Sequence, residues 1–183
     1  MRKVIVTGAF STGKTELIAA LEVDLVGIGL VVTRLPDVAR ECPLPLNHLQ
    51  TEEASLWLLT TQISREIEAS QGHEDVLLCD RGVPDIFAHL LDHTGSGDAR
   101  WLEPTVPFVR KWITTYDVVL FSRIDETAPI APDGLRAEDA AYRTALDQRA
   151  AEALSLRTDT IELANSFRER LAQAREAIIR SLP

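Results

Sequence analysis

The amino-acid sequence predicts a three-layer α/β fold in which helices cover both faces of a parallel β-sheet. Short apolar runs rich in β-branched residues recur along the chain, and segments with helical periodicity separate them. Strands that are apolar at nearly every position are typical of parallel sheets buried on both faces. The expected strands are residues 4–6, 30–33, 76–79, 118–121 and 160–163.

The first of these strands leads into a glycine-bounded loop. The sequence there reads Gly8-Ala9-Phe10-Ser11-Thr12-Gly13-Lys14-Thr15 and continues as an apolar helix. This strand–loop–helix pattern predicts a phosphate-binding P-loop, and the flanking elements argue against an accidental glycine-rich turn. The loop N–H groups can gather at the helix N-terminus, where Lys14 can reach the terminal phosphates and Thr15 can hold Mg²⁺. We therefore expect all eight residues to bind a nucleoside triphosphate.

Three later helices have recognisable ends. One is expected after Thr51, a good N-cap residue that two glutamates follow. Another runs from about residue 138 to residue 156, and the last begins at Ser166, which can form a capping box with Glu169. The residues expected to face the core are Leu56, Leu59, Ile63, Ile67, Tyr142, Leu146, Ala153, Phe167, Leu171, Ala174 and Ile178.

Length and composition favour one domain over residues 1–183, because 183 residues that are 45% hydrophobic can bury one sizeable core. No run of 18 apolar residues predicts a membrane span. The apolar stretch after the basic start ends at Thr7-Gly8 and runs into the loop, which argues against a signal peptide and favours a cytoplasmic protein. Only Cys42 and Cys79 are present, so we expect no disulfide framework, and the four histidines show no metal-ligand spacing.

The net charge of −9 comes from 28 acidic and 19 basic residues. Such a field repels polyanions, so nucleic-acid binding is disfavoured. Nearly all basic residues are arginines, which suit bidentate contacts to phosphate inside a cleft.

Acidic and basic residues follow the third expected strand. Asp80 stands at its carboxyl end, where a P-loop protein usually carries an acid aimed at Mg²⁺, and Arg81 comes next. Ligands of open parallel sheets bind at this edge, so Arg81 could neutralise charge on a transferred phosphoryl group. The alternative is an Asp–Arg pair that only caps the strand end.

A second acid follows the second expected strand. Asp37 would face the same edge of the sheet and could accept a proton from a substrate hydroxyl. Arg40 could hold an anionic part of that substrate. A plain helix N-cap explains Asp37 almost as well.

The longest stretch without periodicity lies between the fourth strand and the helix after it. Two prolines and a glycine predict an exposed, mobile lid at about residues 124–143. Arg136 and Arg143 could close over the triphosphate, although solvated surface arginines are the alternative for both and for Arg149. Asn165, in the turn after the last strand, lies where a nucleotide base could pack.

The motifs exclude two common P-loop classes. GTPases need Asp-x-x-Gly, but residues 80–83 read Asp-Arg-Gly-Val, and no Asn-Lys-x-Asp base reader is present. AAA+ motors place Glu directly after the strand acid, and here Arg81 stands there. The pattern instead suits phosphoryl transfer to a small acceptor, where positioning and charge neutralisation do most of the catalysis.

Four segments together resemble a known group. They are Gly-x-x-Ser-Thr-Gly-Lys-Thr at 8–15, Pro-Asp-Val-Ala-Arg-Glu at 36–41, Asp-Arg-Gly-Val-Pro-Asp at 80–85 and Asp-Gly-x-Arg at 133–136. They look like small AAA-domain P-loop phosphotransferases. These include the ribosylnicotinamide kinase domain of bacterial NAD regulators and, more distantly, deoxynucleoside and thymidylate kinases. The resemblance spans nearly the whole chain.

The resemblance implies a nucleoside kinase-like fold with five parallel strands in the order 2-3-1-4-5 and with ATP and Mg²⁺ on the P-loop. It implies that Asp37 is the substrate-side acid, that Asp80 and Arg81 are the strand-end pair, and that Arg136 is the lid arginine. Relatives usually carry Glu where Asp37 stands, so the acid here is one methylene shorter.

The leading hypothesis is ATP-dependent phosphoryl transfer to a small nucleoside- or nucleotide-like acceptor. Lys14, Asp37, Asp80, Arg81 and Arg136 would be catalytic. A nucleotide-gated regulatory module without a small acceptor is the alternative, and a kinase of DNA or RNA hydroxyls is disfavoured by the charge. Trp101 or Trp112 could mark a homodimer contact, with core packing as the ordinary alternative.

Overall fold

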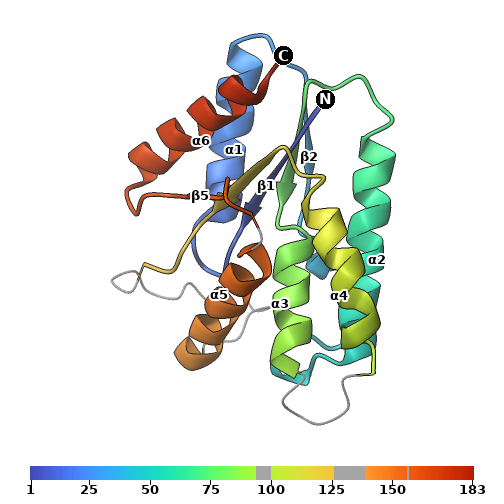
Figure 1. The fold of residues 1–183 in the computed structure, drawn as a ribbon. Coiled ribbons are helices and arrows are strands. Elements are labelled where there is room, and N and C mark those ends of the chain that lie inside the picture. The colour runs from blue at the N-terminus through green and yellow to red at the C-terminus, as the bar shows by residue number, and fades with distance from the viewer. Residues whose placement is uncertain (94–99, 126–138, 156) are drawn as a thin grey trace.

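The computed structural model describes residues 1–93, 100–125, 139–155 and 157–183. Five parallel strands form one sheet in the order β2-β3-β1-β4-β5 (Figure 1). The strands are β1 (Arg2–Thr7), β2 (Val32–Leu35), β3 (Val76–Asp80), β4 (Val118–Phe121) and β5 (Ile161–Glu162). The predicted fold class and strand order are therefore confirmed.

The central strand β1 is buried on both faces because it pairs with β3 on one side and β4 on the other. Ile5 belongs to one apolar cluster, whereas Val4 and Val6 belong to a second cluster across the sheet. Successive side chains of a strand point to opposite faces, so a strand between two helical layers must be apolar at every position. This is the physical reason for the uninterrupted apolar runs.

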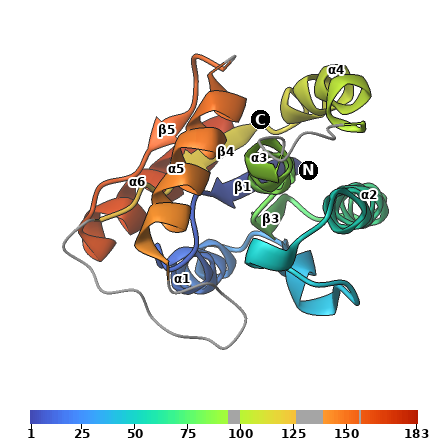
Figure 2. The ribbon, with the colours of Figure 1, turned by 90° about the horizontal axis from the view of Figure 1, so that it is seen from below.

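Helices cover both faces of the sheet, which confirms the predicted three layers (Figures 1 and 2). The second cluster is completed by α1 (Lys14–Gly27) and α6 (Phe167–Ser181), which lie side by side. The first cluster is completed by four helices on the other face, α2 (Glu52–Ala69), α3 (Val83–His93), α4 (Leu102–Ile113) and α5 (Ala140–Leu154). Two short 3-10 helices, η1 (Val38–Glu41) and η2 (Asn47–Leu49), connect β2 to α2.

The predicted helix starts are confirmed at two of three places. Thr51 Oγ1 accepts a hydrogen bond from the N–H of Ala54, and Ser166 Oγ accepts one from the N–H of Glu169. The helix expected to begin at about residue 138 begins at Ala140 instead. Its N-cap is Asp139, whose carboxylate accepts from two backbone N–H groups of the first turn.

The predicted inward faces are correct for most residues but wrong for Ile67 and Phe167, which are 48% and 40% exposed. Leu56 and Leu171 are only half-buried. The inward face of α2 instead includes Gln62 and Glu66, each 1% exposed. Hydrophobic periodicity finds apolar residues alone, so buried polar groups shift the real face away from the predicted one.

Two further findings concern the cysteines and the length of the apolar helices. Cys42 and Cys79 are free thiols, and Cys79 is buried in β3. Within the described residues, no helix is both long enough and apolar enough to cross a membrane.

Candidate active site

The loop after β1 has the backbone that a phosphate site requires. Gly8 and Gly13 adopt φ values of +130° and +75°, which side chains strongly disfavour. A Cβ at Gly8 would lie 2.2 Å from the carbonyl oxygen of Ser122, so no larger residue fits there. Gly13 is the N-cap residue of α1, and no described side chain caps this helix. The first N–H groups of α1 can therefore face an anion.

Lys14 places its ammonium inside this loop. The side chain is 4% exposed. Its Nζ donates to the carbonyl oxygens of Gly8, at 2.8 Å, and of Ala9, and lies 3.3 Å from Thr12 Oγ1. The charge is thus held at the concave side of the loop, where it could meet the terminal phosphates of a nucleotide.

Two buried arginines bind carbonyl groups of the loop. Arg143 of α5 donates to the carbonyl oxygens of Phe10 and Ser11, at 3.1 and 3.0 Å. Arg170 of α6 donates to the carbonyl oxygen of Thr12 at 2.7 Å. The two arginines are 5% and 7% exposed. Three consecutive carbonyl groups of the loop are therefore bound by positively charged side chains of α5 and α6.

Desolvation by burial lowers the pKa of Arg143, and the carboxylates of Asp147 and Asp125 oppose this effect. A guanidinium titrates far above neutral pH, so Arg143 keeps its charge. The alternative that Arg143 is a solvated surface arginine is therefore wrong, and its closing over the triphosphate stays a prediction. Arg149 does lie on the surface, where it pairs with Glu152 at 3.1 Å.

Arg170 is a site residue that sequence reasoning missed. It also donates to the carbonyl oxygens of Ala164 and Asn165, at 3.1 and 3.3 Å, and so ties the turn after β5 to the P-loop. A signal was present, because Arg170 precedes Ala174 and Ile178 at the four-residue spacing of one helix face. Asn165 itself is exposed, and its contact with a base stays a prediction.

Thr15 and Asp80 come together as predicted. Asp80 ends β3 beside Val6 of β1, and its Oδ2 accepts a hydrogen bond from Thr15 Oγ1 at 2.7 Å. The carboxylate is 6% exposed. A hydroxyl and a carboxylate oxygen at the mouth of a P-loop are hard ligands of the kind Mg²⁺ prefers, so these residues fit the ion.

Arg81 pairs with two acids. Its Nε lies 2.9 Å from Asp37 Oδ2, and its Nη1 lies 3.6 Å from Asp85 Oδ1. Desolvation by burial alone would lower the pKa of Arg81, but Asp37, Asp85 and Asp80 outweigh it and raise the pKa. Arg81 has a φ of +74°, a left-handed conformation that bends the chain immediately after the strand. The guanidinium is therefore charged and held between its partners.

Asp37 is the N-cap that the alternative interpretation predicted, and its role as a proton acceptor stays a prediction. Its Oδ1 accepts from the N–H of Ala39 at 3.0 Å and caps η1, while its Oδ2 binds Arg81. The shorter acid still reaches the site because the cap fixes it at the end of β2. Capping and pairing with Arg81 are thus compatible.

Asp85 in the first turn of α3 was also missed. Its two carboxylate oxygens accept from the N–H of Gly8 at 2.9 Å and the N–H of Gly82 at 3.0 Å. It is 4% exposed and connects the start of the P-loop to the turn after β3. The available signal was its position in the first turn of a helix, where acids are favoured.

A pocket opens beside the loop, between η1, α2 and α3. Its polar lining includes Asp37, Arg40, Gln62, Arg81 and His89, and Phe10 of the P-loop forms part of its wall. Apolar side chains complete it, as in most sites for small organic ligands. Arg81 also lines a smaller cavity with Gly8 and Ala9, so it lies between the pocket and the loop.

Two predictions have other outcomes. Arg136 and most of the proposed lid lie outside the described residues. Trp101 is 40% exposed, so core packing is wrong for it, whereas Trp112 is half-buried, with Lys3 Nζ 4.6 Å from the centre of its ring. Neither observation tests a homodimer.

The sheet order and the loop together define a P-loop protein with a nucleoside kinase-like fold. A family model described as an AAA domain matches residues 3–170, and the chain belongs to this family. The resemblance on which the sequence analysis relied is thereby confirmed. No curated protein matches the chain significantly.

Solved structures agree on the fold. Two NadR proteins, one in complex with NAD and AMP-PNP and one in complex with NR, have 18% and 15% sequence identity to this chain and TM-scores of 0.68 and 0.72. These matches cover 98% and 99% of this chain but 49% and 50% of the NadR chains, so it spans about half their length. The deoxyadenosine kinase from M. mycoides, solved with dcmp and dcdp, has 14% identity and a TM-score of 0.61, with 97% of each chain covered.

Proposed function

We propose that this protein transfers the terminal phosphoryl group of ATP to a hydroxyl of a small nucleoside- or nucleotide-like acceptor. The observation that carries the proposal is the position of the Asp37–Arg81 ion pair. Both residues line the pocket, whose wall combines apolar and polar side chains, and Arg81 also lines the smaller cavity beside Gly8 and Ala9 of the P-loop. A donor on the loop and an acceptor in the pocket would therefore meet at this pair.

In the proposed reaction the acceptor hydroxyl oxygen bonds to the γ-phosphorus, while the bond to the bridging oxygen of ADP breaks. Lys14 and the loop N–H groups hold the β- and γ-phosphates. Thr15 and Asp80 would hold Mg²⁺, which when bound supplies charge neutralisation at the phosphate oxygens. Each group acts by position and charge, as phosphoryl transfer requires.

Asp37 would orient the acceptor and take its hydroxyl proton. A neighbouring guanidinium favours the ionised carboxylate, which can accept a hydrogen bond from the hydroxyl. Arg81 would balance charge on the transferred group, Arg40 would bind an anionic part of the acceptor, and Arg136 would approach from the lid. Catalysis would then depend on Asp37, whereas nucleotide binding would not.

The test is Asp37→Asn, which keeps a side-chain oxygen to cap η1 but removes the charge. Protein is mixed with ATP, Mg²⁺ and a panel of nucleosides, nucleotides and sugars, and ADP formation is followed. We expect acceptor-dependent ADP formation to fall at least ~100-fold, the order of a lost acid–base group. ATP affinity, measured by calorimetry, should change less than about threefold, because Asp37 follows β2 and lies in the wall of the pocket, where it binds Arg81 and the N–H of Ala39.

Asp24→Asn is the matched control and should leave both measurements unchanged, because Asp24 is a half-buried acid of α1 outside the P-loop and outside the lining of the pocket. Full transfer by Asp37→Asn would remove Asp37 from the mechanism. Absence of acceptor-dependent turnover in the wild type, together with a nucleotide-dependent protein partner, would favour the regulatory module instead.

A further inference from the structure

The turn that presents Arg81 is held by hydrogen bonds at three successive N–H groups. The N–H of Arg81 donates to a carbonyl oxygen of β1 at 3.1 Å, and the N–H of Gly82 donates to Asp85 Oδ2 at 3.0 Å. The N–H of Val83 donates to Tyr116 Oη at 3.1 Å. Tyr116 lies between α4 and β4, so this third bond comes from outside the candidate site.

The turn needs this third bond because its backbone is unusual. Arg81 has a left-handed φ of +74°, which a residue with a side chain keeps only where its surroundings hold it. Val83 begins α3, and the N–H groups of a first helical turn have no acceptor within the helix. Pro84 has no N–H, and the N–H of Asp85 turns back to the carbonyl oxygen of Gly82 at 3.1 Å. The phenol hydroxyl therefore caps the start of α3.

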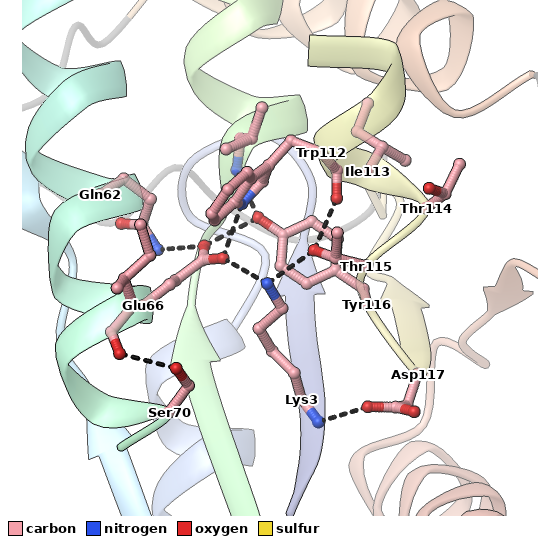
Figure 3. Close-up of polar contacts among 12 residues, drawn as sticks. Lys3, Gln62, Glu66, Ser70, Trp112, Ile113, Thr114, Thr115, Tyr116 and Asp117 are labelled. Carbon is pink, nitrogen blue, oxygen red and sulfur yellow. Dashed lines mark hydrogen bonds and ion pairs between the residues drawn. The ribbon is translucent and has the colours of Figure 1, made fainter. Parts of the chain in front are cut away.

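A buried carboxylate fixes the direction of that hydroxyl. Tyr116 Oη donates to Glu66 Oε1 at 2.8 Å (Figure 3). Glu66 is buried and also accepts from the side chains of Lys3, Gln62 and Trp112, at 3.0, 2.9 and 2.8 Å. Four donors use the capacity of a carboxylate. Because the phenol proton points to Glu66, the oxygen is left to accept from the N–H at the start of α3.

Tyr116 is also held through its backbone. Arg157 Nη1 donates to the carbonyl oxygens of Tyr116 and Ile113, at 2.8 and 2.9 Å. Desolvation by burial, and next to it the charge of Glu66, raise the pKa of Tyr116 well above its ordinary value, so the phenol keeps its proton. Among the described residues, Tyr116 lines neither the pocket nor the smaller cavity beside the P-loop. Its hydroxyl thus acts on the site only through the turn.

We infer that Tyr116 is a positioning residue for phosphoryl transfer, because its hydroxyl fixes the turn 81–83 and with it the guanidinium of Arg81. This rests on the proposed function, in which Arg81 balances charge on the transferred group. Charge on that group changes most in the transition state, so a displaced guanidinium slows the chemical step more than it weakens nucleotide binding. Glu66 contributes by holding the hydroxyl in its direction.

The test is Tyr116→Phe, which removes the hydroxyl and keeps the ring. ADP formation is measured with ATP, Mg²⁺ and whichever nucleoside, nucleotide or sugar of the panel gives the fastest wild-type turnover. We expect kcat to fall about tenfold or more, while the KM for ATP changes less than about threefold. A loss of stability alone would not produce this split.

Hydrogen exchange measured by NMR tests the position of the turn without turnover. In the wild type, the Val83 N–H should exchange at least ~100-fold more slowly than in an unfolded chain. In Tyr116→Phe, the Val83 N–H and the Arg81 Nε–H, which faces Asp37, should exchange about tenfold faster or more, whereas the N–H groups of α1 should not change. Should Tyr116→Phe fail to fold, the wild-type measurement decides, because a freely exchanging Val83 N–H overturns the inference.

Trp112→Phe is the matched control. It removes a donor to the other oxygen of Glu66 and leaves the bond between Tyr116 and Val83 in place. Both variants should lower the temperature of thermal unfolding, but Trp112→Phe should keep kcat and the Val83 exchange rate within about twofold of the wild type. A kcat in Tyr116→Phe that falls no further than in this control overturns the inference.

The outcomes separate the inference from the proposed function. Wild-type turnover with an unchanged kcat in Tyr116→Phe would contradict the inference alone. Absence of acceptor-dependent ADP formation in the wild type would contradict the proposed function. The exchange of the Val83 N–H and the Arg81 Nε–H would then still decide whether Tyr116 positions the turn.

Discussion

The P-loop and the adjacent pocket are built in different ways. The loop acts through its backbone, with three carbonyl groups bound by Arg143 and Arg170 and its N–H groups at the start of α1. The pocket acts through side chains bound to one another, as in the pairs Asp37–Arg81 and Gln62–Glu66. The ligand class of the loop therefore follows from local backbone geometry, whereas that of the pocket follows from contacts between distant elements.

The largest expected effect tests the P-loop, the first of the two regions compared. Lys14→Ala removes the ammonium inside the loop, and we expect ATP binding to weaken at least ~100-fold, which is about 2.7 kcal/mol. Calorimetry with ATP and Mg²⁺ measures this loss. Lys111→Ala, on the exposed end of α4, is the control and should bind ATP as the wild type does. Undiminished binding by Lys14→Ala would mean that the loop is not a phosphate site.

A second variant tests whether the loop backbone depends on its arginine supports. Arg170→Met leaves the carbonyl groups of Thr12, Ala164 and Asn165 without this donor. We expect the free energy of unfolding to fall by about 2–4 kcal/mol and ATP affinity to fall about tenfold or more. Denaturant titration and calorimetry measure the two effects.

Arg168→Met, on the exposed face of the same helix, should change the free energy of unfolding by no more than about 0.5 kcal/mol. An equal fall in the free energy of unfolding in the two variants would show that the hydrogen bonds of Arg170 to the loop do not stabilise the fold.

The smallest expected effect tests the side-chain contacts on the pocket side of the molecule. A Cβ at Gly82 would lie 3.0 Å from Tyr116 Oη and 3.1 Å from Ile5 Cγ2, so Gly82→Ala should lower the free energy of unfolding by about 1–3 kcal/mol. Because the contact is with Tyr116 and Ile5 and not with the P-loop residues, ATP affinity should change less than about threefold. Denaturant titration and calorimetry measure these two quantities.

Gly27→Ala is the control for chain entropy, since nothing lies within 4 Å of its Cβ position at the end of α1. It should raise the free energy of unfolding by up to about 1 kcal/mol. A loss of ATP affinity of about tenfold or more in Gly82→Ala would contradict the separation of loop and pocket.

The sequence was sufficient for the sheet, the loop and the Thr15–Asp80 pair. The central strands β1, β3 and β4 could be predicted because burial on both faces requires apolar residues in succession. The edge strands β2 and β5 are less buried, and β2 lies at Val32–Leu35 rather than at the expected residues 30–33. The loop could be predicted because its residues are consecutive, so their spacing alone encodes the backbone shape. Asp80 followed from the rule that ligands gather at the carboxyl edge of a parallel sheet.

The supports of the site could not be predicted in the same way. Arg170 and Thr12 are 158 residues apart, and Glu66 meets Tyr116 across 50 residues. A hydrophobic pattern treats Gln62, Glu66 and Arg170 as solvent-facing because they are polar, although each is buried by partners that another element supplies. Only the folded arrangement shows that these charges and dipoles are paired.

The contact between Arg170 and Thr12 has a consequence for biosynthesis. At ordinary elongation rates of about 5–20 residues per second, the ribosome adds the arginine roughly 8–30 s after the threonine that it supports. During that interval the nascent loop would lack the hydrogen bond from Arg170. A nucleotide that binds only the completed loop would then favour the finished chain by mass action, so cellular ATP could assist the last step of maturation.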